Sequence, residues 1–326
     1  MFTLKELNFR TIFVINGQEG RRLRVSNGEL LIEEKEETKE KYKTLTKIPF
    51  QKVIALFVIG HITVTSPLME KCQNFGVSLI VMKPNLRPIF FWNPSTEANF
   101  LLRQRQYALA REDLSIAQLI VANKIRNQIK TLQSTRKKDP DTQEALSLCT
   151  TLLAQIPSAN SYNTLMGLEG ACAKAFFSAF FKEQNWVARR PRTKCDPINA
   201  ALDIGYTLLF NYMECFVRLF GFDLYVGVFH RLWFKRKSLV CDLVEPFRCL
   251  IDKTVRTAFN RGQFKAKDFE AKKGEYLLKR EKSSYYYKVF MEALIPRKGD
   301  FFAYVRDYYR SFMRDKPKNQ YPTFIP

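Results

Sequence analysis

The first part of the chain alternates short runs of branched and aromatic residues with turn-forming residues. The runs FRTIFVI, RRLRV, LLIEE, KVIALFVIG, HITVTS, VSLIVM and PIFFW lie between Phe9 and Trp92. Such runs, separated by turn signals, are typical of β-strands. We therefore predict a mainly antiparallel β domain with tight turns at Asn16-Gly17 and Asn27-Gly28. The stretch SPLMEKCQNF interrupts it and predicts one short helix, with Ser66 as cap and Pro67 at the first helical position.

Beyond Asn93-Pro94-Ser95 the apolar residues recur at spacings of three and four, as in an α-helix. The longest such stretches are LLRQRQYALA, SIAQLIVANKIRNQIKTL, NTLMGLEGACAKAFFSAFF and NAALDIGYTLLFNYMECFVRLF. The charged segment RKKDPDT, residues 136–142, is expected to connect two helices. The change of period predicts two domains: a β domain over residues 1–94 and a helical domain over 95–326.

Composition supports a folded chain with a polyanionic partner. Hydrophobic residues make up 46% of the 326 residues, and 53 Lys and Arg against 32 Asp and Glu leave a formal charge of +21. Such an excess favours nucleic acid, with an anionic membrane surface next, although a generally basic soluble protein is the alternative. No apolar run is long enough to span a membrane and the start lacks a signal peptide, which predicts a cytoplasmic protein without membrane attachment.

The seven cysteines are scattered and form no C-x-x-C pair, so we expect reduced, structural thiols and no zinc finger. Histidine is the scarcer ligand type, because the chain has only two. His61 has no carboxylate near it in the sequence and is interpreted as structural. His230 is followed by Asp242 and Glu245, which leaves two interpretations: a metal ligand, or a hydrogen-bonded core histidine.

Asp242 and Glu245 are three residues apart in a helical pattern, which places both on one helix face. A cation between them would relieve their repulsion, and that cation is either a metal ion or a basic side chain such as Arg248. Pro246 lacks an amide hydrogen, so a kink is expected there. Glu169 is the lone acid in the apolar start of its helix, between Gly167 and Gly170, and is either a functional group or a carboxylate that faces solvent or a structural partner.

Three basic stretches, residues 189–194, 231–237 and 267–282, are candidates for contacts to phosphate, although exposed basic segments are often only solvated. The first is a loop kept extended by Pro191 and followed by a helix with Asp196 as N-cap and Pro197 at its first position. A further region, Lys267 to Lys282 with Tyr285 to Tyr287, is either a DNA contact or a solvated helix face with packed aromatics. The predicted DNA-binding residues are Arg189, Arg190, Arg192, Lys194, Arg231, Lys235, Arg236, Lys237 and Arg248.

Taken in order, GLEGACAKAFF around Glu169, RRP followed by DPINA and GY, His230, DLVEPFR and QFKAKDF resemble the CRISPR-associated DNA integrase of spacer acquisition. The resemblance extends over almost the whole chain. It implies an α+β protein with an N-terminal antiparallel β-sandwich-like domain and a C-terminal all-α catalytic domain. It also implies Glu169, His230 and Glu245 as metal ligands and Asp242 as a further catalytic acid. Whether the third ligand is Asp242 or Glu245 stays open, with Glu245 preferred.

The same resemblance implies a reaction and a set of partners. With Mg²⁺ or Mn²⁺ bound, the 3′-OH ends of short foreign DNA fragments would be joined to the CRISPR repeat by transesterification, and water in place of the 3′-OH would give endonuclease activity. Homodimers formed through the β domain, two of them assembled with a small dimeric companion protein, are expected in the prokaryotic cytoplasm. The rival hypotheses are a non-catalytic nucleic-acid-binding protein and a simple metal-dependent nuclease.

Overall fold

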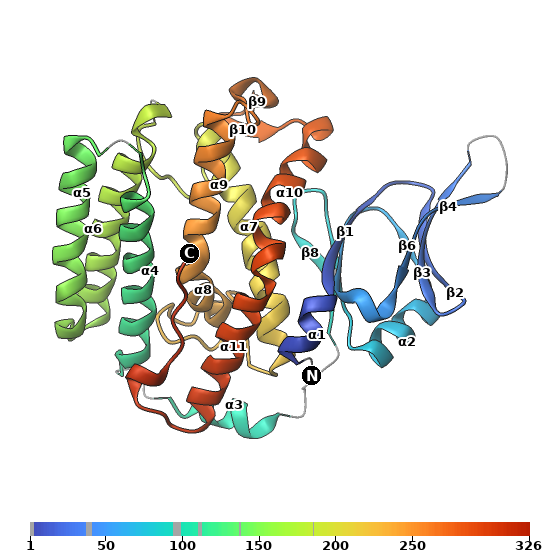
Figure 1. Ribbon diagram of the computed structural model, residues 1–326, viewed down its shortest axis with the longest axis horizontal. Helices are drawn as coiled ribbons and strands as arrows, with labels where there is room; N and C mark the ends of the chain where they lie inside the picture. The colour runs from blue at the N-terminus through green and yellow to red at the C-terminus, as the bar shows by residue number, and fades with distance from the viewer. Residues whose placement is uncertain (1–2, 37–40, 94–98, 110–112, 137, 185) are drawn as a thin grey trace. The chain divides into compact units, whose positions relative to one another are not determined.

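The computed structural model describes residues 3–36, 41–93, 99–109, 113–136, 138–184 and 186–326 (Figure 1). Contacts divide the chain into two compact units. The first comprises Met1–Ala98 with Arg218–Gly221 and Ile295–Ala303, and the second comprises the remainder. The boundary expected near residues 93–97 falls largely on residues 94–98, which lie outside the described residues. The first unit is rich in strands and the second in helices, which confirms the predicted α+β layout.

One sheet of the first unit has the strand order β1-β5-β7-β8. The apolar run KVIALFVIG forms β5, an inner strand whose residues Val53 to Val58 are all fully buried. β5 pairs in parallel with β1 and β7, whereas β8 runs antiparallel to β7. The bounds are β1 (Thr11–Gly17), β5 (Val53–Gly60), β7 (Ser78–Met82) and β8 (Pro88–Trp92).

The second sheet of this unit has the order β4-β3-β2-β6. Its first three strands are antiparallel neighbours, and β6 adds to β2 in parallel. Asn27 and Gly28 join β2 to β3 with φ angles of 50° and 77°, as the primed hairpin turns require, so this predicted turn is confirmed. The bounds are β2 (Arg21–Ser26), β3 (Glu29–Lys35), β4 (Tyr42–Pro49) and β6 (Thr63–Val64).

Both sheets contribute to one hydrophobic core. Leu23 and Leu30 of the second sheet share a buried cluster with Leu56 and Leu79 of the first. The predicted short helix is α2 (Ser66–Phe75), which adds Leu68 and Cys72 to the same cluster. Its predicted cap is wrong by one residue, because Thr65 is at the N-cap position and Ser66 is the first helical residue. A core shared by two sheets is the arrangement of a β-sandwich. Two short elements, α1 (Leu4–Phe9) and the 3₁₀ turn η1 (Phe50–Lys52), accompany the sheets.

The expectation of a mainly antiparallel domain is wrong for the first sheet. Parallel neighbours need a crossover connection, and β5 returns to β7 through β6 and α2. The turn at Asn16-Gly17 is wrong as well, because both residues belong to β1 and pair with Ile59 and Gly60. A Cβ on Gly17 would lie 2.6 Å from the carbonyl oxygen of His61, so this glycine permits close approach of two backbones.

The second unit is built mainly of helices. The expectation that it is all-α is wrong at one place, where β9 and β10 form an antiparallel hairpin around Lys273 and Gly274, whose φ angles are 52° and 81°. Its longer helices are α3 (Phe100–Tyr107), α4 (Ser115–Gln133), α5 (Pro140–Gln155), α6 (Tyr162–Phe180), α7 (Pro197–Leu219), α9 (Arg248–Asn260), α10 (Arg280–Leu294) and α11 (Lys298–Met313). The shorter elements are α8 (Ser238–Val244), β9 (Phe269–Lys272), β10 (Glu275–Leu278) and the 3₁₀ turns η2 (Ile156–Ser158), η3 (Lys182–Gln184), η4 (Glu245–Phe247), η5 (Ala266–Asp268) and η7 (Lys318–Gln320). The 3₁₀ turn η6 (Ile295–Arg297), the end of α7 and the start of α11 are assigned to the first unit.

Side-chain caps set where several of these helices begin. Asp196 accepts a hydrogen bond from the amide of Asn199 at 2.7 Å, which confirms it as the N-cap before Pro197. Ser161 caps α6 in the same way through Thr164. In the green part of Figure 1, α4, α5 and α6 pack against one another. Among the helices that the structure describes, none is both long and apolar enough to cross a membrane.

We expect Gly60→Ala to destabilise the first unit strongly. Gly60 has a φ of 101°, and an added Cβ would lie 2.6 Å from the carbonyl oxygen of Gly17. Conformational strain and overpacking together should lower the free energy of unfolding by roughly 3 kcal/mol. Gly28→Ala is the matched control, since Gly28 also has positive φ but open space around it. Its cost should be about 1 kcal/mol. Equal losses for the two variants in urea unfolding would contradict this account.

Candidate active site

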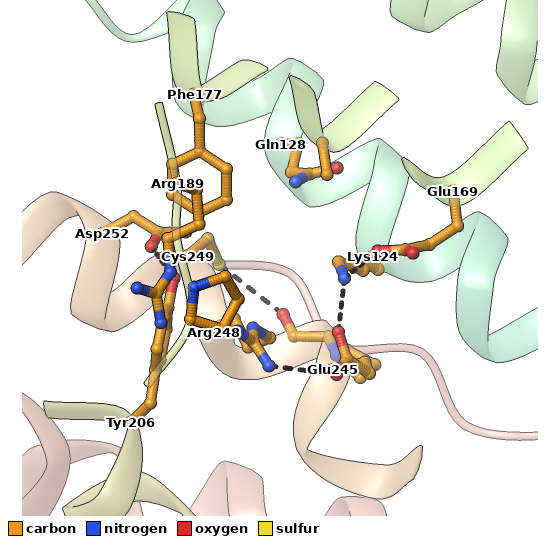
Figure 2. Close-up of a pocket in the computed structure, with 13 residues that line it drawn as sticks. Lys124, Gln128, Glu169, Phe177, Arg189, Tyr206, Glu245, Arg248, Cys249 and Asp252 are labelled. Carbon is orange, nitrogen blue, oxygen red and sulfur yellow. Dashed lines mark hydrogen bonds and ion pairs between the residues drawn. The ribbon is translucent and has the colours of Figure 1, made fainter. Parts of the chain in front are cut away.

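Three elements that are distant in sequence bring two carboxylates to one ammonium group. Lys124 comes from α4, Glu169 from α6 and Glu245 from η4 (Figure 2). The Lys124 Nζ forms ion pairs with Oε1 of Glu169 and, at 2.5 Å, with Oε2 of Glu245. The other Glu245 oxygen accepts a hydrogen bond from Nη1 of Arg248 at 3.1 Å. Two of the predicted site acids therefore converge, and the group between them is a lysine.

Glu245 reaches this position because the helix is interrupted beside Pro246. α8 ends at Val244, the 3₁₀ turn η4 follows, and α9 begins at Arg248. The interruption confirms the kink expected from proline, which removes a helical hydrogen bond. It also places Asp242 and Glu245 in different elements, α8 and η4. The two side chains have separate partners, which are the loop of His230 for Asp242 and the pair Lys124 and Arg248 for Glu245.

Asp242 is fully buried and accepts hydrogen bonds from the loop before α8. Its Oδ2 accepts hydrogen bonds from the amides of Val228 and Phe229 at 2.6 and 3.1 Å. Its Oδ1 accepts from the amide of His230 at 2.8 Å and lies 2.7 Å from the ring Nδ1 of His230. A Cβ on Gly227 would lie 2.5 Å from Oδ2, so the loop needs glycine there. Asp242 thus holds His230 in place.

The hydrogen bond to Asp242 also selects the tautomer of His230. A carboxylate that already accepts from backbone amides can only accept from the ring, so Nδ1 carries the proton. The lone pair of Nε2 is then left for another partner, as in histidines that bind metals. His230 and Arg231 line a pocket of about 690 Å³ with Tyr107, Tyr162 and Gly227.

The donor set suits a hard divalent cation. Carboxylate oxygens and one imidazole are the ligands that Mg²⁺ and Mn²⁺ accept. Among the described residues, the buried Oε2 of Glu245 has no hydrogen-bond partner, so it depends on the charge of a nearby cation. Within the described ranges, however, no three His, Cys, Asp or Glu side chains are grouped closely enough to hold a metal ion. Lys124 stands between the two carboxylates in this structure.

Glu245 is held in its charged form. Burial raises the pKa of Glu245, but Arg248, Lys124 and His230 lower it, and the result is a pKa of about 2. For Lys124, burial lowers the pKa while Glu169 and Glu245 raise it, and the net direction is upward. Both partners of the ion pair are therefore charged at neutral pH.

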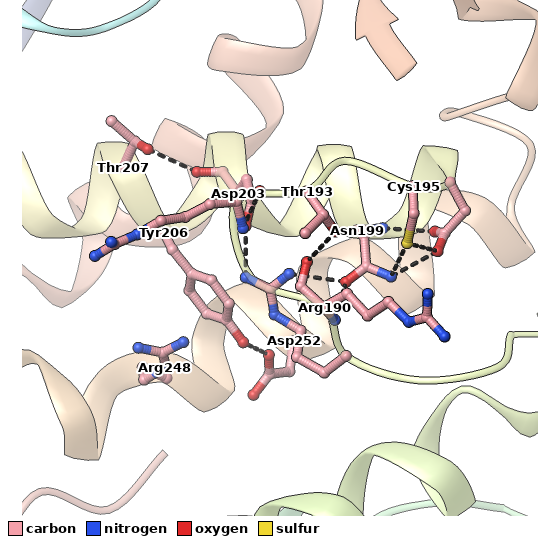
Figure 3. A network of polar contacts seen from close by, with 12 residues as sticks. Arg190, Thr193, Cys195, Asn199, Asp203, Tyr206, Thr207, Arg248 and Asp252 are labelled. Carbon is pink, nitrogen blue, oxygen red and sulfur yellow. Dashed lines mark hydrogen bonds and ion pairs between the residues drawn. The ribbon is translucent and has the colours of Figure 1, made fainter. Parts of the chain in front are cut away.

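A second polar network lies beside the carboxylates (Figure 3). Arg248 lies 4.0 Å and Arg189 5.3 Å from the ring centre of Tyr206, whose hydroxyl donates to Asp252. Arg189 also donates to Asn199 at 2.8 Å and to Asp203 at 2.5 Å. A pocket of about 210 Å³ is lined by Arg189, Tyr206, Arg248 and Asp252 of this network and by the Lys124 cluster. The network surrounds that pocket with both guanidinium groups and carboxylates.

Known proteins match this chain over most of its length. A family model described as "CRISPR associated protein Cas1" matches residues 14–292. The chain belongs to the Cas1 family. A relative, the "CRISPR-associated endonuclease Cas1 1" of Thermodesulfovibrio yellowstonii, is 28% identical over 253 residues, which are 73% of this chain and 80% of that protein. The resemblance drawn from the motifs is confirmed.

Solved structures show the same fold as this Cas1-family chain. A casposase bound to an integration product has a TM-score of 0.73 at 21% identity, with 94% of this chain and 91% of that chain covered. A chain of a Cas6-RT-Cas1–Cas2 complex has a TM-score of 0.76 at 21% identity and is matched over 97% of this chain but only 36% of its own length. At these identities the likeness concerns the fold alone.

The predicted DNA-binding residues lie in different surroundings. Arg190, Arg192, Arg231 and Lys235 are exposed. Arg189 and Arg248 belong to the Tyr206 network, and Lys194 lies 3.4 Å from Glu275. Lys237 donates to both oxygens of the buried Glu214, at 2.6 and 2.7 Å, while Arg236 is half-buried. In the further basic region, Tyr286 and Tyr287 are buried.

Sequence reasoning missed Lys124, Tyr206 and Asp252. A signal for Lys124 was present, because it is a charged residue within the apolar run of SIAQLIVANKIRNQIKTL. Tyr206 belongs to the GY motif that had been noted without a role. His61, interpreted as structural, is exposed and belongs to the first unit.

We expect Asp252 to make stability depend on pH. Burial raises the pKa of Asp252 from 3.8 to about 6, although Tyr206, Arg248 and Arg189 each act to lower it. The folded chain therefore holds this proton more tightly than the unfolded chain, and stability is lost as pH rises between these values. Relative to Asp252→Asn, the free energy of unfolding should fall by roughly 2 kcal/mol between pH 4 and pH 6.5. Parallel curves for the two proteins in denaturant titrations would contradict the raised pKa.

Proposed function

We propose that this Cas1-family chain is the metal-dependent DNA integrase and endonuclease of CRISPR adaptation. The observation that carries the proposal is the convergence of Glu169 and Glu245 on one cation, together with a histidine, His230, that Asp242 engages through Nδ1. The relatives and neighbours support it, because they are named as Cas1 endonucleases and as a casposase bound to an integration product. The reaction class is transesterification at a phosphodiester.

Glu169, Glu245 and His230 would hold Mg²⁺ or Mn²⁺. When bound, the metal would supply positive charge at the scissile phosphate and at the leaving oxygen. Glu245 is preferred over Asp242 as the third ligand, since both oxygens of Asp242 are used by the amides of the loop and the ring of His230. Asp242 would act as a positioning residue that orients His230 and keeps its proton on Nδ1.

The basic side chains of the chain would orient the DNA. A 3′-OH positioned in line with the phosphorus forms the new P–O bond while the bond to the leaving oxygen breaks, and water at the same place gives cleavage. The pocket of about 690 Å³ that His230 and Arg231 line has room for a nucleotide, within the usual range of roughly 300–1,000 Å³ for ligand pockets. Arg248 both pairs with Glu245 and contacts Tyr206, so it would keep Glu245 charged during turnover.

Its expected DNA partners are a short spacer-precursor duplex and the CRISPR repeat. The net charge of +21 suits a protein that binds two duplexes through their backbones. Homodimers through residues 1–94, and assembly of two dimers with a small companion protein, remain part of the proposal. One structural neighbour is named as a complex that contains Cas1 and Cas2, which is consistent with such an assembly.

Glu169→Ala should slow joining and cleavage at least about a hundredfold, while DNA affinity measured without metal changes little, because a ligand is lost but the exposed cations remain. The assay combines the protein with Mn²⁺, a short duplex bearing free 3′-OH ends and a plasmid that carries the repeat. Glu144→Ala, which alters an exposed glutamate on α5, is the control and should be fully active. Unchanged joining by Glu169→Ala would reject the site.

The same assay separates the proposal from its rivals. Joined product supports an integrase, and cleavage without joining would indicate a simple nuclease. A mobility shift without covalent change would indicate a nucleic-acid-binding protein, and would overturn the proposed activity.

We expect the exposed arginines of the 189–194 loop to contribute phosphate contacts. Replacing Arg190 and Arg192 by Ala together should weaken binding to unrelated DNA sequences about equally and reduce the slope of log K against log salt by about 2. Fluorescence anisotropy at several salt concentrations measures this slope. As a control, Lys182 is exposed but lies within ion-pair distance of Asp141 and Asp139, so Lys182→Ala should leave the slope nearly unchanged. An unaltered slope in the double variant would exclude this loop from the DNA contacts.

A further inference from the structure

Lys124 is placed where the proposed metal would bind. Its side chain is 11% exposed, and the side chains of Glu169 and Glu245 are 18% and 6% exposed. The lysine enters from α4 between buried neighbours such as Val121 and Ile125. Lysine is seldom enclosed to this extent unless it is paired. Its pairing with two acids at once explains why it is tolerated.

The lysine supplies the charge on which one oxygen depends. In the part of the chain that the structure describes, Oε2 of Glu245 has no hydrogen-bond partner, and its ion pair with Lys124 compensates its burial. Oε1 of Glu169 is paired with the same ammonium group. Without a cation between them, two buried carboxylates would face each other at high electrostatic cost.

We propose that Lys124 is the resident cation of this site, which a divalent metal must displace, and that the displaced ammonium group then binds a phosphate of the DNA. The inference rests on the proposed function. Its consequence is a linkage: because the phosphate attracts the lysine away from Glu169 and Glu245, bound DNA should strengthen metal binding, and bound metal should strengthen DNA binding.

Geometry prevents the lysine and the metal from being present together in this arrangement. Carboxylate oxygens bind Mg²⁺ at about 2.1 Å, and Lys124 Nζ already lies 2.5 Å from Oε2 of Glu245. A metal at the same oxygens would nearly overlap the ammonium nitrogen and would repel its charge. The pocket of about 210 Å³ that Lys124 lines is also lined by Arg189 and Arg248, so a phosphate that enters it would meet several cations.

A purely structural role for Lys124 predicts the opposite result. If the lysine only holds the two carboxylates in position, its removal loosens Glu169 and Glu245 and weakens metal binding. If it competes with the metal, its removal leaves two unneutralised carboxylates and tightens metal binding. The sign of the change in metal affinity therefore separates the two roles.

The test is a titration of the full chain with Mn²⁺ in the absence of DNA. The electron paramagnetic resonance signal of the free Mn²⁺ ion measures how much metal is unbound at each step. Lys124→Met should bind Mn²⁺ at least about tenfold more tightly than the wild type. Lys130→Met is the matched control, because Lys130 is an exposed lysine on the same helix, and its affinity should equal that of the wild type. Adding a short duplex should increase the Mn²⁺ affinity of the wild type by a larger factor than that of Lys124→Met.

Equal or weaker Mn²⁺ binding by a folded Lys124→Met would overturn the inference, and so would an equal effect of DNA on both proteins. Should Lys124→Met fail to fold without metal, Lys124→Arg decides the question. It keeps the charge between the carboxylates, so it should bind Mn²⁺ no more tightly than the wild type, and tighter binding would overturn the inference.

Glu169→Ala in the same titration tests the proposed function separately. Loss of Mn²⁺ binding in Glu169→Ala, combined with no gain in Lys124→Met, would reject only the role of Lys124. Mn²⁺ binding that survives Glu169→Ala, or a wild type that binds no Mn²⁺ even with DNA, would reject the proposed metal site and the inference with it.

Discussion

Much of the second unit is organised around two carboxylates that need a cation between them. Glu169 and Glu245 are largely buried, and like charges in such a place are stable only when positive charge neutralises them. The structure supplies Lys124 to both acids and Arg248 to Glu245. This requirement for a cation is why we propose that a divalent metal binds at the same oxygens.

Glu245 keeps its position because the turn that carries it is held from several directions. Asn127 of α4 donates to the carbonyl oxygens of Pro246 and Phe324, at 2.9 Å in each case. The ring of Phe324 stacks on Phe247 with 4.0 Å between ring centres. The irregular η4 turn is thus fixed by a helix before it in sequence and by a segment far after it. Such support matters at a site where small displacements of a charged group change its chemistry.

The sequence located most of the elements, and several polar residues that stand out from them. Apolar periodicity predicted most strands of the first unit, α2 and the helices α3, α4, α6 and α7, but not β4, β9 or β10. The lone acid Glu169 was recognised in the apolar start of its helix. Strand direction was not predictable for the first sheet, because a run such as KVIALFVIG does not indicate which strands lie beside it. The charge of Arg189 suggested phosphate contact, yet this side chain is tied to Asn199 and Asp203.

The sequence by itself determined the division into β-rich and helical parts, the start of α7 and membership of the Cas1 family, because local periodicity, caps and ordered motifs are written in neighbouring residues. The tertiary structure alone decided that β1, β5 and β7 run parallel, that Asp242 serves the loop of His230 and that Lys124 joins Glu169 to Glu245. These outcomes depend on contacts between segments far apart in the chain. The partner of a charged or apolar group is chosen by packing, which no local pattern specifies.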